Sequence, residues 1–174
     1  MNLSDPQNLS RRDVLFGQGK SASLKEPENH LPWATGKAID DFCTGCGDCV
    51  SACPEEVIIL TEKGHATVDF LKGECVFCQE CADICPEPVF ATKSDRDQVP
   101  PWVGQPEISK ACLAIQGVVC QVCKDQCPEN IIKFPPTLGA VAQPDINTQS
   151  CTACGACVSS CPTAAIQIKF ERSA

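Results

Sequence analysis

Short apolar runs rich in β-branched residues punctuate this chain, and they predict strands. The runs lie at residues 57–60, 66–70, 131–134 and 166–170, and each is too brief for a helix. Cysteine-rich loops lie between them. Each half of the chain is therefore expected to contain two cysteine loops, each followed by a very short helix and then a strand. Hairpin-like connections are expected at residues 62–64 and 135–139.

The second half of the sequence repeats the first. Trp33 lies ten residues before Cys43, and Trp102 lies ten residues before Cys112. Because each half begins with such a tryptophan, we interpret both rings as packing residues. A linker at residues 94–101, with charges and two prolines, separates the halves. The predicted organisation is a flexible amino-terminal segment at 1–30, a first module at 31–95 and a second module at 96–174.

The composition indicates that a large hydrophobic core cannot hold this fold. Aromatic residues make up 5% of the 174 positions, whereas proline and glycine are plentiful and 16 residues are cysteine. Cross-links must therefore replace part of the core. No stretch approaches the ~18 apolar residues of a membrane span, so a soluble protein is expected. The formal net charge is −8 with Lys and Arg scattered, which argues against nucleic-acid binding.

Three cysteine runs follow one pattern, C-x2-C-x2-C-x3-C-P, which is typical of iron–sulfur proteins. They begin at Cys43, Cys75 and Cys151. A 4Fe-4S cluster has four iron corners, and a tight loop with three closely spaced thiolates can wrap three of them. In two-cluster ferredoxins the fourth cysteine of each run ligates the other cluster. Small residues leave room for backbone N–H groups near the cluster sulfurs, namely Gly45, Gly47, Ala153, Gly155 and Ala156.

Zinc and disulfides are the two other uses that such cysteines could have. Zinc sites are built from paired C-x2-C knuckles, but zinc has no use for a third and fourth cysteine in the same short run. Neighbouring C-x2-C thiols seldom pair outside redox motifs, and eight bridges would form a contrived framework. The spacing therefore favours iron–sulfur clusters over both alternatives.

A fourth run departs from the pattern at its start. Its spacing is C-x7-C-x2-C-x3-C-P, beginning at Cys112. Either Cys112 reaches its iron through the enlarged loop, or it is an inert thiol and the site holds three irons. We favour ligation because Cys112 keeps its register with Trp102. The sixteen cysteines then form four groups of four, which predicts four 4Fe-4S clusters.

The crossing of the fourth cysteine fixes the predicted ligands, which we call sets 1 to 4 after the run that supplies the first three. Set 1 is Cys43, Cys46, Cys49 and Cys85, and set 2 is Cys75, Cys78, Cys81 and Cys53. Set 3 is Cys112, Cys120, Cys123 and Cys161, and set 4 is Cys151, Cys154, Cys157 and Cys127. The predicted fold class is α+β: two tandem bacterial two-cluster ferredoxin-like modules, loop-rich, with short strands and short helices.

The amino terminus contains the pair Arg11 and Arg12, followed by three apolar residues at 14–16. A twin-arginine export signal would need a longer apolar stretch, but residues 17–29 are mostly polar, so no cleavable signal is predicted. The segment is either a disordered tail or a docking peptide that orders on a partner. In the second case Arg11 and Arg12 are candidate partner-binding residues.

Ser10-Arg11-Arg12, the Pro-Trp pair before each half's first cysteine and the four ferredoxin-type runs together resemble the NapF family. These are ferredoxin-type accessory proteins of the periplasmic nitrate reductase system. The resemblance implies a cytoplasmic protein that contacts the precursor of a NapA-type catalytic subunit before its export. It also implies a role in maturing that subunit, by supplying or reducing its iron–sulfur cluster.

A four-cluster electron carrier between a dehydrogenase and a terminal acceptor is the alternative function. It would use the same clusters and need no maturation partner. A substrate-transforming enzyme lacks support, because no nucleophile–base pair or glycine-rich phosphate loop appears. His30 and His65 are expected to be solvated.

Overall fold

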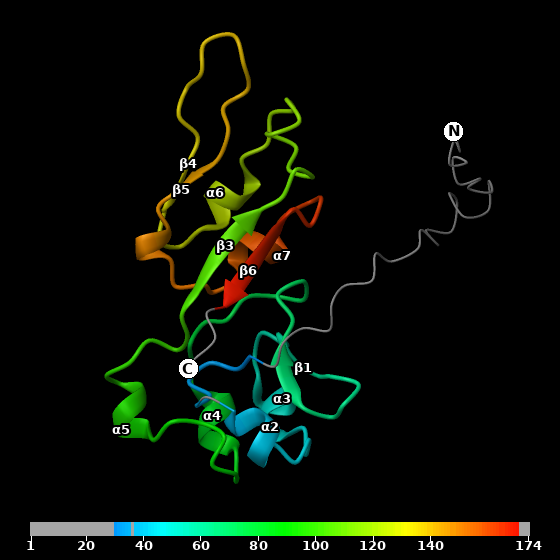
Figure 1. Cartoon of the computed structure of the whole chain (residues 1–174), viewed down its shortest axis with the longest axis vertical. Coiled ribbons are helices and arrows are strands. Elements are labelled where there is room, and N and C mark those ends of the chain that lie inside the picture. The colour runs from blue at the N-terminus through cyan, green and yellow to red at the C-terminus, as the bar shows by residue number, and fades with distance from the viewer. Residues whose placement is uncertain (1–29, 36, 171–174) are drawn as a thin grey trace, which may run out of the picture.

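The computed structural model describes residues 30–35 and 37–170, and its elements are short and joined by long loops (Figure 1). The first half contains α2 (Ala38–Phe42), α3 (Asp48–Ala52), β1 (Ile58–Leu60), β2 (Ala66–Val68), α4 (Glu80–Ile84) and α5 (Lys93–Arg96). The second half contains β3 (Gly104–Ile108), α6 (Val122–Gln126), β4 (Ile132–Lys133), β5 (Asp145–Ile146), the 3-10 helix η1 (Thr148–Ser150), α7 (Ala156–Ser159) and β6 (Ile166–Phe170). The predicted loop-rich α+β character is confirmed.

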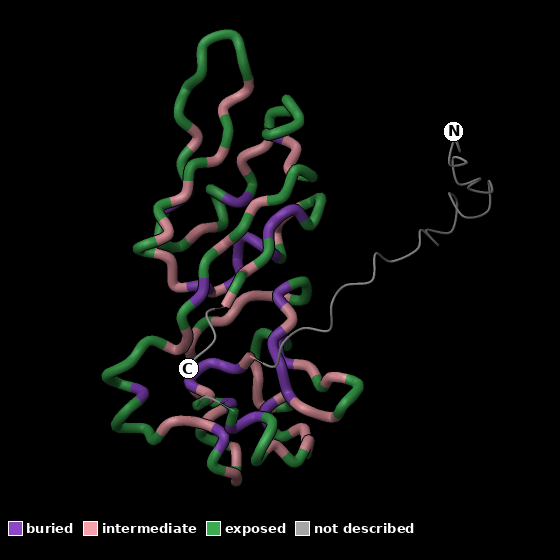
Figure 2. The backbone as a smooth tube through the Cα atoms, in the orientation of Figure 1, coloured by how far each residue is buried: buried purple, intermediate pink, exposed green. Residues whose placement is uncertain are grey.

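Within the described residues the strands form three two-stranded sheets, all antiparallel. β1 and β2 make the predicted hairpin. β4 and β5 pair around a connection at 134–144, which is longer than predicted and mostly exposed (Figure 2). β3 pairs with β6 along its whole length, so the start and the end of the second half close on each other. An isolated bridge between Ala34 and Phe90 does the same in the first half.

Two strands were missed because their sequences lack a strand pattern. β3 contains Pro106, which lies opposite Ile168. Both strands of a two-stranded sheet are edge strands, so a residue without an N–H is tolerated there. β5 has only two residues. The predicted strands at 57–60, 66–70, 131–134 and 166–170 are confirmed as β1, β2, β4 and β6.

The prediction that helices follow the cysteine loops is wrong. The short helices α3, α4, α6 and α7 begin inside the runs and carry the third cysteine of each, at Cys49, Cys81, Cys123 and Cys157. α3 packs against α4, and α6 packs against α7. Each half is therefore built around a pair of helices that bear cysteines.

Aromatic side chains fill the contact between the two halves. The Phe70 ring meets the Trp102 ring edge to face, with centroids 5.7 Å apart. Trp102 also packs on Phe170 at 5.2 Å and on Phe77 at 6.0 Å, and Phe77 packs on Trp33 at 6.4 Å. We call these five residues the aromatic cluster. Their contacts confirm the packing role predicted for both tryptophans.

Each tryptophan indole N–H also finds a main-chain partner. Trp33 Nε1 donates to the carbonyl of Val99 at 3.3 Å, and Trp102 Nε1 donates to the carbonyl of Thr152 at 3.1 Å. Partly buried indoles need such acceptors.

Both histidines, expected to be solvated, are half-buried. The His30 ring packs on the Phe170 ring with centroids 4.3 Å apart. His65 Nδ1 lies 3.5 Å from an Asp40 carboxylate oxygen, and its side chain is only 26% exposed. Each histidine contacts a residue distant in sequence, Phe170 for His30 and Asp40 for His65, which sequence context alone did not reveal.

Candidate metal centres

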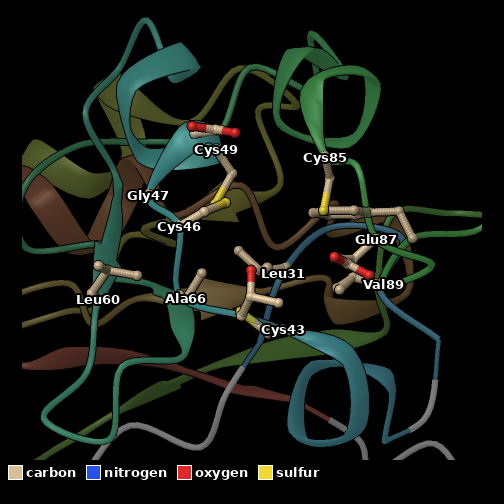
Figure 3. Close-up of a pocket in the computed structure, with 14 residues that line it drawn as sticks. Leu31, Cys43, Cys46, Gly47, Cys49, Leu60, Ala66, Cys85, Glu87 and Val89 are labelled. Atoms are coloured by element: carbon tan, nitrogen blue, oxygen red, sulfur yellow. The ribbon is translucent and has the colours of Figure 1, made fainter.

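Four pockets in the structure each collect one of the predicted cysteine sets. Cys43, Cys46, Cys49 and Cys85 line the pocket shown in Figure 3, where the sulfurs of Cys49 and Cys85 face it from opposite sides. The other pockets are lined by set 2, set 4 and set 3. The pockets are open to solvent. Their volumes, including that open space, are about 370 Å³ for set 1, 370 Å³ for set 2, 340 Å³ for set 4 and 350 Å³ for set 3, so the four pockets are similar in size.

The helices explain how one run serves two pockets. Cys49 lies on α3 and lines the set 1 pocket, whereas Cys53 directly follows α3 and lines the set 2 pocket. Cys81 lies on α4 and lines the set 2 pocket, whereas Cys85 directly follows α4 and lines the set 1 pocket. The chain turns from helical to extended backbone at the fourth cysteine, which carries that side chain away from its own run.

Left-handed backbone bends the three regular runs around their pockets. The residue before the second cysteine has a positive φ in each of them: Gly45 (68°), Phe77 (57°) and Ala153 (55°). The residue after the second cysteine does too: Gly47 (86°), Gln79 (67°) and Gly155 (87°). Such alternation turns backbone N–H groups toward one concave side, an arrangement found at iron–sulfur and phosphate sites.

The backbone of set 4 already donates to sulfur. Ala153 N–H donates to Cys151 Sγ at 3.3 Å, and Ala165 N–H donates to Cys161 Sγ of set 3 at the same distance. Although burial raises the pKa of Cys161, the N–H groups of Ala165 and Thr163 lower it below the ordinary value. Both contacts favour the thiolate form that binds iron.

Burial and mutual repulsion act on the third cysteine of each run. Burial raises the pKa of Cys49 to about 11, with further increases from Cys43, Cys85 and Cys46. The pKa of Cys81 and that of Cys157 rise to about 12, again chiefly through burial. These side chains are thiols in the metal-free protein, so binding a metal there must release protons.

The enlarged loop of the third run brings Cys112 to its set. Cys112 lines one pocket with Cys120, Cys123 and Cys161. After burial, Cys112 is the largest contributor to the raised pKa of Cys123, which reaches about 11. Neither Val119 nor Gln121 of this run has a positive φ; Gly117 in the loop does, at 85°. The longer loop thus reaches the pocket by a different backbone path.

The geometry fits a cluster better than the two alternatives. All sixteen cysteines lie in the described residues, and all are free. Across residues 30–35 and 37–170, no group of three or more His, Cys, Asp or Glu side chains is arranged to hold a single metal ion. The four cysteines of each set line a common pocket, as the four iron corners of a 4Fe-4S cluster require.

Comparison with known proteins finds 4Fe-4S domains in both halves of the chain. A family model described as a 4Fe-4S dicluster domain matches residues 42–89, and a 4Fe-4S binding domain matches residues 144–167. "Ferredoxin-type protein NapF" of Haemophilus influenzae is 39% identical over 168 residues, covering 92% of this chain and 93% of that protein. The chain belongs to the NapF family of ferredoxin-type proteins.

Two further relatives extend the comparison. "Ferredoxin-type protein NapF" of Escherichia coli K12 is 38% identical over 166 residues, covering 94% of this chain and 96% of that protein. A "Probable ferredoxin" of Methanosarcina thermophila is 59% identical over 29 residues, or 17% of this chain and 50% of that protein. The chain is thus an iron–sulfur protein of ferredoxin type, an electron-transfer or accessory protein and not an enzyme.

Two further sequence predictions concern the amino-terminal segment and membrane-spanning helices. Arg11, Arg12 and nearly all of the segment predicted to be flexible lie outside the described residues. In the described part of the chain, no helix has the length and hydrophobicity of a membrane span.

The left-handed positions at Phe77 and Gln79 are the site features that sequence reasoning missed. Both are non-glycine residues in a conformation that L-residues rarely adopt. Their alignment with Gly45 and Gly47 in the first run was the available signal.

Proposed function

We propose that this NapF-family protein holds four 4Fe-4S clusters and assists the cytoplasmic maturation of a NapA-type nitrate reductase catalytic subunit before its export. The observation that carries the cluster count is the gathering of all sixteen cysteines into four pockets of similar size. Membership of the NapF family supports the nitrate reductase partner. The two halves act as tandem two-cluster modules, divided near residues 95 and 96.

Sets 1 to 4 would hold the clusters, with Cys112 as a full ligand of set 3. When bound, each cluster supplies a one-electron redox couple. The chain's own contribution is to bury the third cysteine of each set, at 7–9% exposure, and to aim backbone N–H groups at the sulfurs. Both features retain a bound group and hold its surroundings rigid.

This retention favours reduction of the partner over donation of a cluster to it. A donated cluster must leave its site, yet each set draws its fourth ligand from the paired run, so release would disturb two sites in one half. We therefore propose that the protein reduces the iron–sulfur cluster of the immature subunit, one electron at a time.

A pull-down with the cytoplasmic precursor tests the partner. The loaded wild-type protein should retain the precursor at low salt and less of it at moderate salt, because an acidic protein with bound clusters attracts positive surfaces. Arg11→Ala combined with Arg12→Ala should keep the iron content and weaken binding. Lys124→Ala combined with Lys133→Ala removes two exposed positive charges elsewhere and serves as the matched control. Absence of binding at both salt levels would refute the precursor as partner and favour a general electron carrier.

Labelling the clusters with ⁵⁷Fe separates reduction from donation. After incubation and separation, the precursor should carry a reduced cluster and no label. Transfer of ⁵⁷Fe to the precursor would contradict the reduction mechanism while leaving the partner in place.

A further inference from the structure

We propose that the four cysteine sets form one continuous row through both halves, in the order set 1, set 2, set 4, set 3. A single electron would then cross the whole protein instead of being confined to one half. The inference rests on the four-cluster part of the proposed function. It adds the order of the sites and the residues that join the two halves.

Within each half, the packed helices place two sets side by side. α3 contributes Cys49 to set 1 and is followed by Cys53 of set 2. The helix α4 packs on α3; it contributes Cys81 to set 2 and is followed by Cys85 of set 1. The pair α6 and α7 joins set 3 to set 4 in the same way. Each half therefore supplies one adjacent pair.

The junction between halves is a main-chain hydrogen bond between two ligand cysteines. Cys75 N–H of set 2 donates to the carbonyl of Cys154 in set 4 at 2.8 Å. Backbones joined in this way have Cα atoms roughly 5 Å apart. Trp102 Nε1 donates to Thr152, in the same loop as Cys154. Sets 2 and 4 are therefore the inner sites of the row, and sets 1 and 3 are its ends.

A close contact between Phe70 and Gly155 holds this junction. Phe70 belongs to the first half and Gly155 to the fourth cysteine run, one residue after Cys154. A Cβ added at Gly155 would lie 2.0 Å from Phe70 Cδ1, so the ring occupies the place of a side chain. The Phe70 ring also packs on the rings of Trp102 and Phe170. Glycine at this position thus lets the two halves meet.

The electron count of the proposed path is simple. A reduced one-electron carrier, either an iron–sulfur protein or a flavin semiquinone, loses one electron at one end of the row. An iron–sulfur acceptor gains that electron at the other end. No covalent bond forms or breaks.

Two double variants test the order directly through electron paramagnetic resonance of the fully reduced protein. Cys46→Ser with Cys120→Ser removes the end clusters and leaves sets 2 and 4. Cys78→Ser with Cys154→Ser leaves sets 1 and 3. Each should retain about eight irons. The inner pair should show spin–spin splitting, and the outer pair should show two independent signals; independent signals from the inner pair would overturn the row.

A glycine comparison tests the junction with every cysteine in place. Gly155→Ala should reduce the splitting between halves, because the added Cβ would clash with the Phe70 ring. Gly47→Ala is the matched control: Gly47 occupies the same motif position with φ 86° against 87°, yet nothing lies within 4 Å of its Cβ site. If a cysteine double variant loses more iron than expected, the comparison of Gly155→Ala with Gly47→Ala tests the junction instead.

Iron content separates the two levels of the proposal. A wild-type protein well below sixteen irons would refute the four-cluster function itself. Sixteen irons with the same splitting in Gly155→Ala, Gly47→Ala and wild type would overturn only the junction.

Discussion

Replacing Cys53 by serine should remove the cluster of the second run and spare the cluster of its own run. The structure makes this specific, because Cys53 lines the set 2 pocket while Cys49, four residues earlier, lines the set 1 pocket. A serine oxygen is a poor substitute for thiolate at iron. With four irons per cluster, the expected iron content falls from about sixteen to about twelve.

Pairing the substitution with a second one shows which cluster is lost. Cys53→Ser with Cys78→Ser affects set 2 twice, so the iron content should stay at about twelve. Cys53→Ser with Cys46→Ser affects sets 2 and 1, so it should fall to about eight. The assay is iron and labile sulfide on anaerobically prepared protein. The opposite result, about eight for the first pair and about twelve for the second, would refute the crossing of ligands between runs.

Three further changes have definite expected outcomes. Cys112→Ser should lose about four irons, as should Cys120→Ser; wild-type iron content would make Cys112 an inert thiol. Phe70→Ala should lower the free energy of unfolding by about 3–5 kcal/mol in guanidinium titration, whereas Phe42→Ala, at a ring that is 48% exposed, should cost far less; equal losses would contradict the role of the aromatic cluster. Gly45→Ala places a Cβ 2.4 Å from the Gly64 carbonyl oxygen and should speed loss of the set 1 cluster, while Gly64→Ala, whose Cβ meets nothing within 4 Å, should not; identical decay rates would remove the steric argument.

The grouping of the cysteines around four pockets was predictable, because the spacing of 4Fe-4S ligands follows from the chemistry of the cluster. The three thiolates of C-x2-C-x2-C can wrap one cluster. The fourth cysteine of the run follows a short helix and reaches the other cluster. This logic placed even Cys112, despite its enlarged loop, beside the cysteines with which the structure groups it.

Other features depended on contacts that no local pattern encodes. β3 is a strand because β6 lies beside it, although Pro106 argues against one. The His30 ring is partly covered because Phe170, at the far end of the sequence, packs on it. The contact between Phe70 and Gly155 joins two halves, although each half has its own two cysteine runs and no sequence motif indicates a contact with the other. Tertiary packing, which pairs distant residues, decided all three.

The iron and acid-labile sulfide bound per chain test the proposed four-cluster function most directly. Anaerobically purified protein should contain about sixteen of each, because four complete cysteine sets each hold a 4Fe-4S cluster. A value near eight, or zinc in place of iron, would contradict the account.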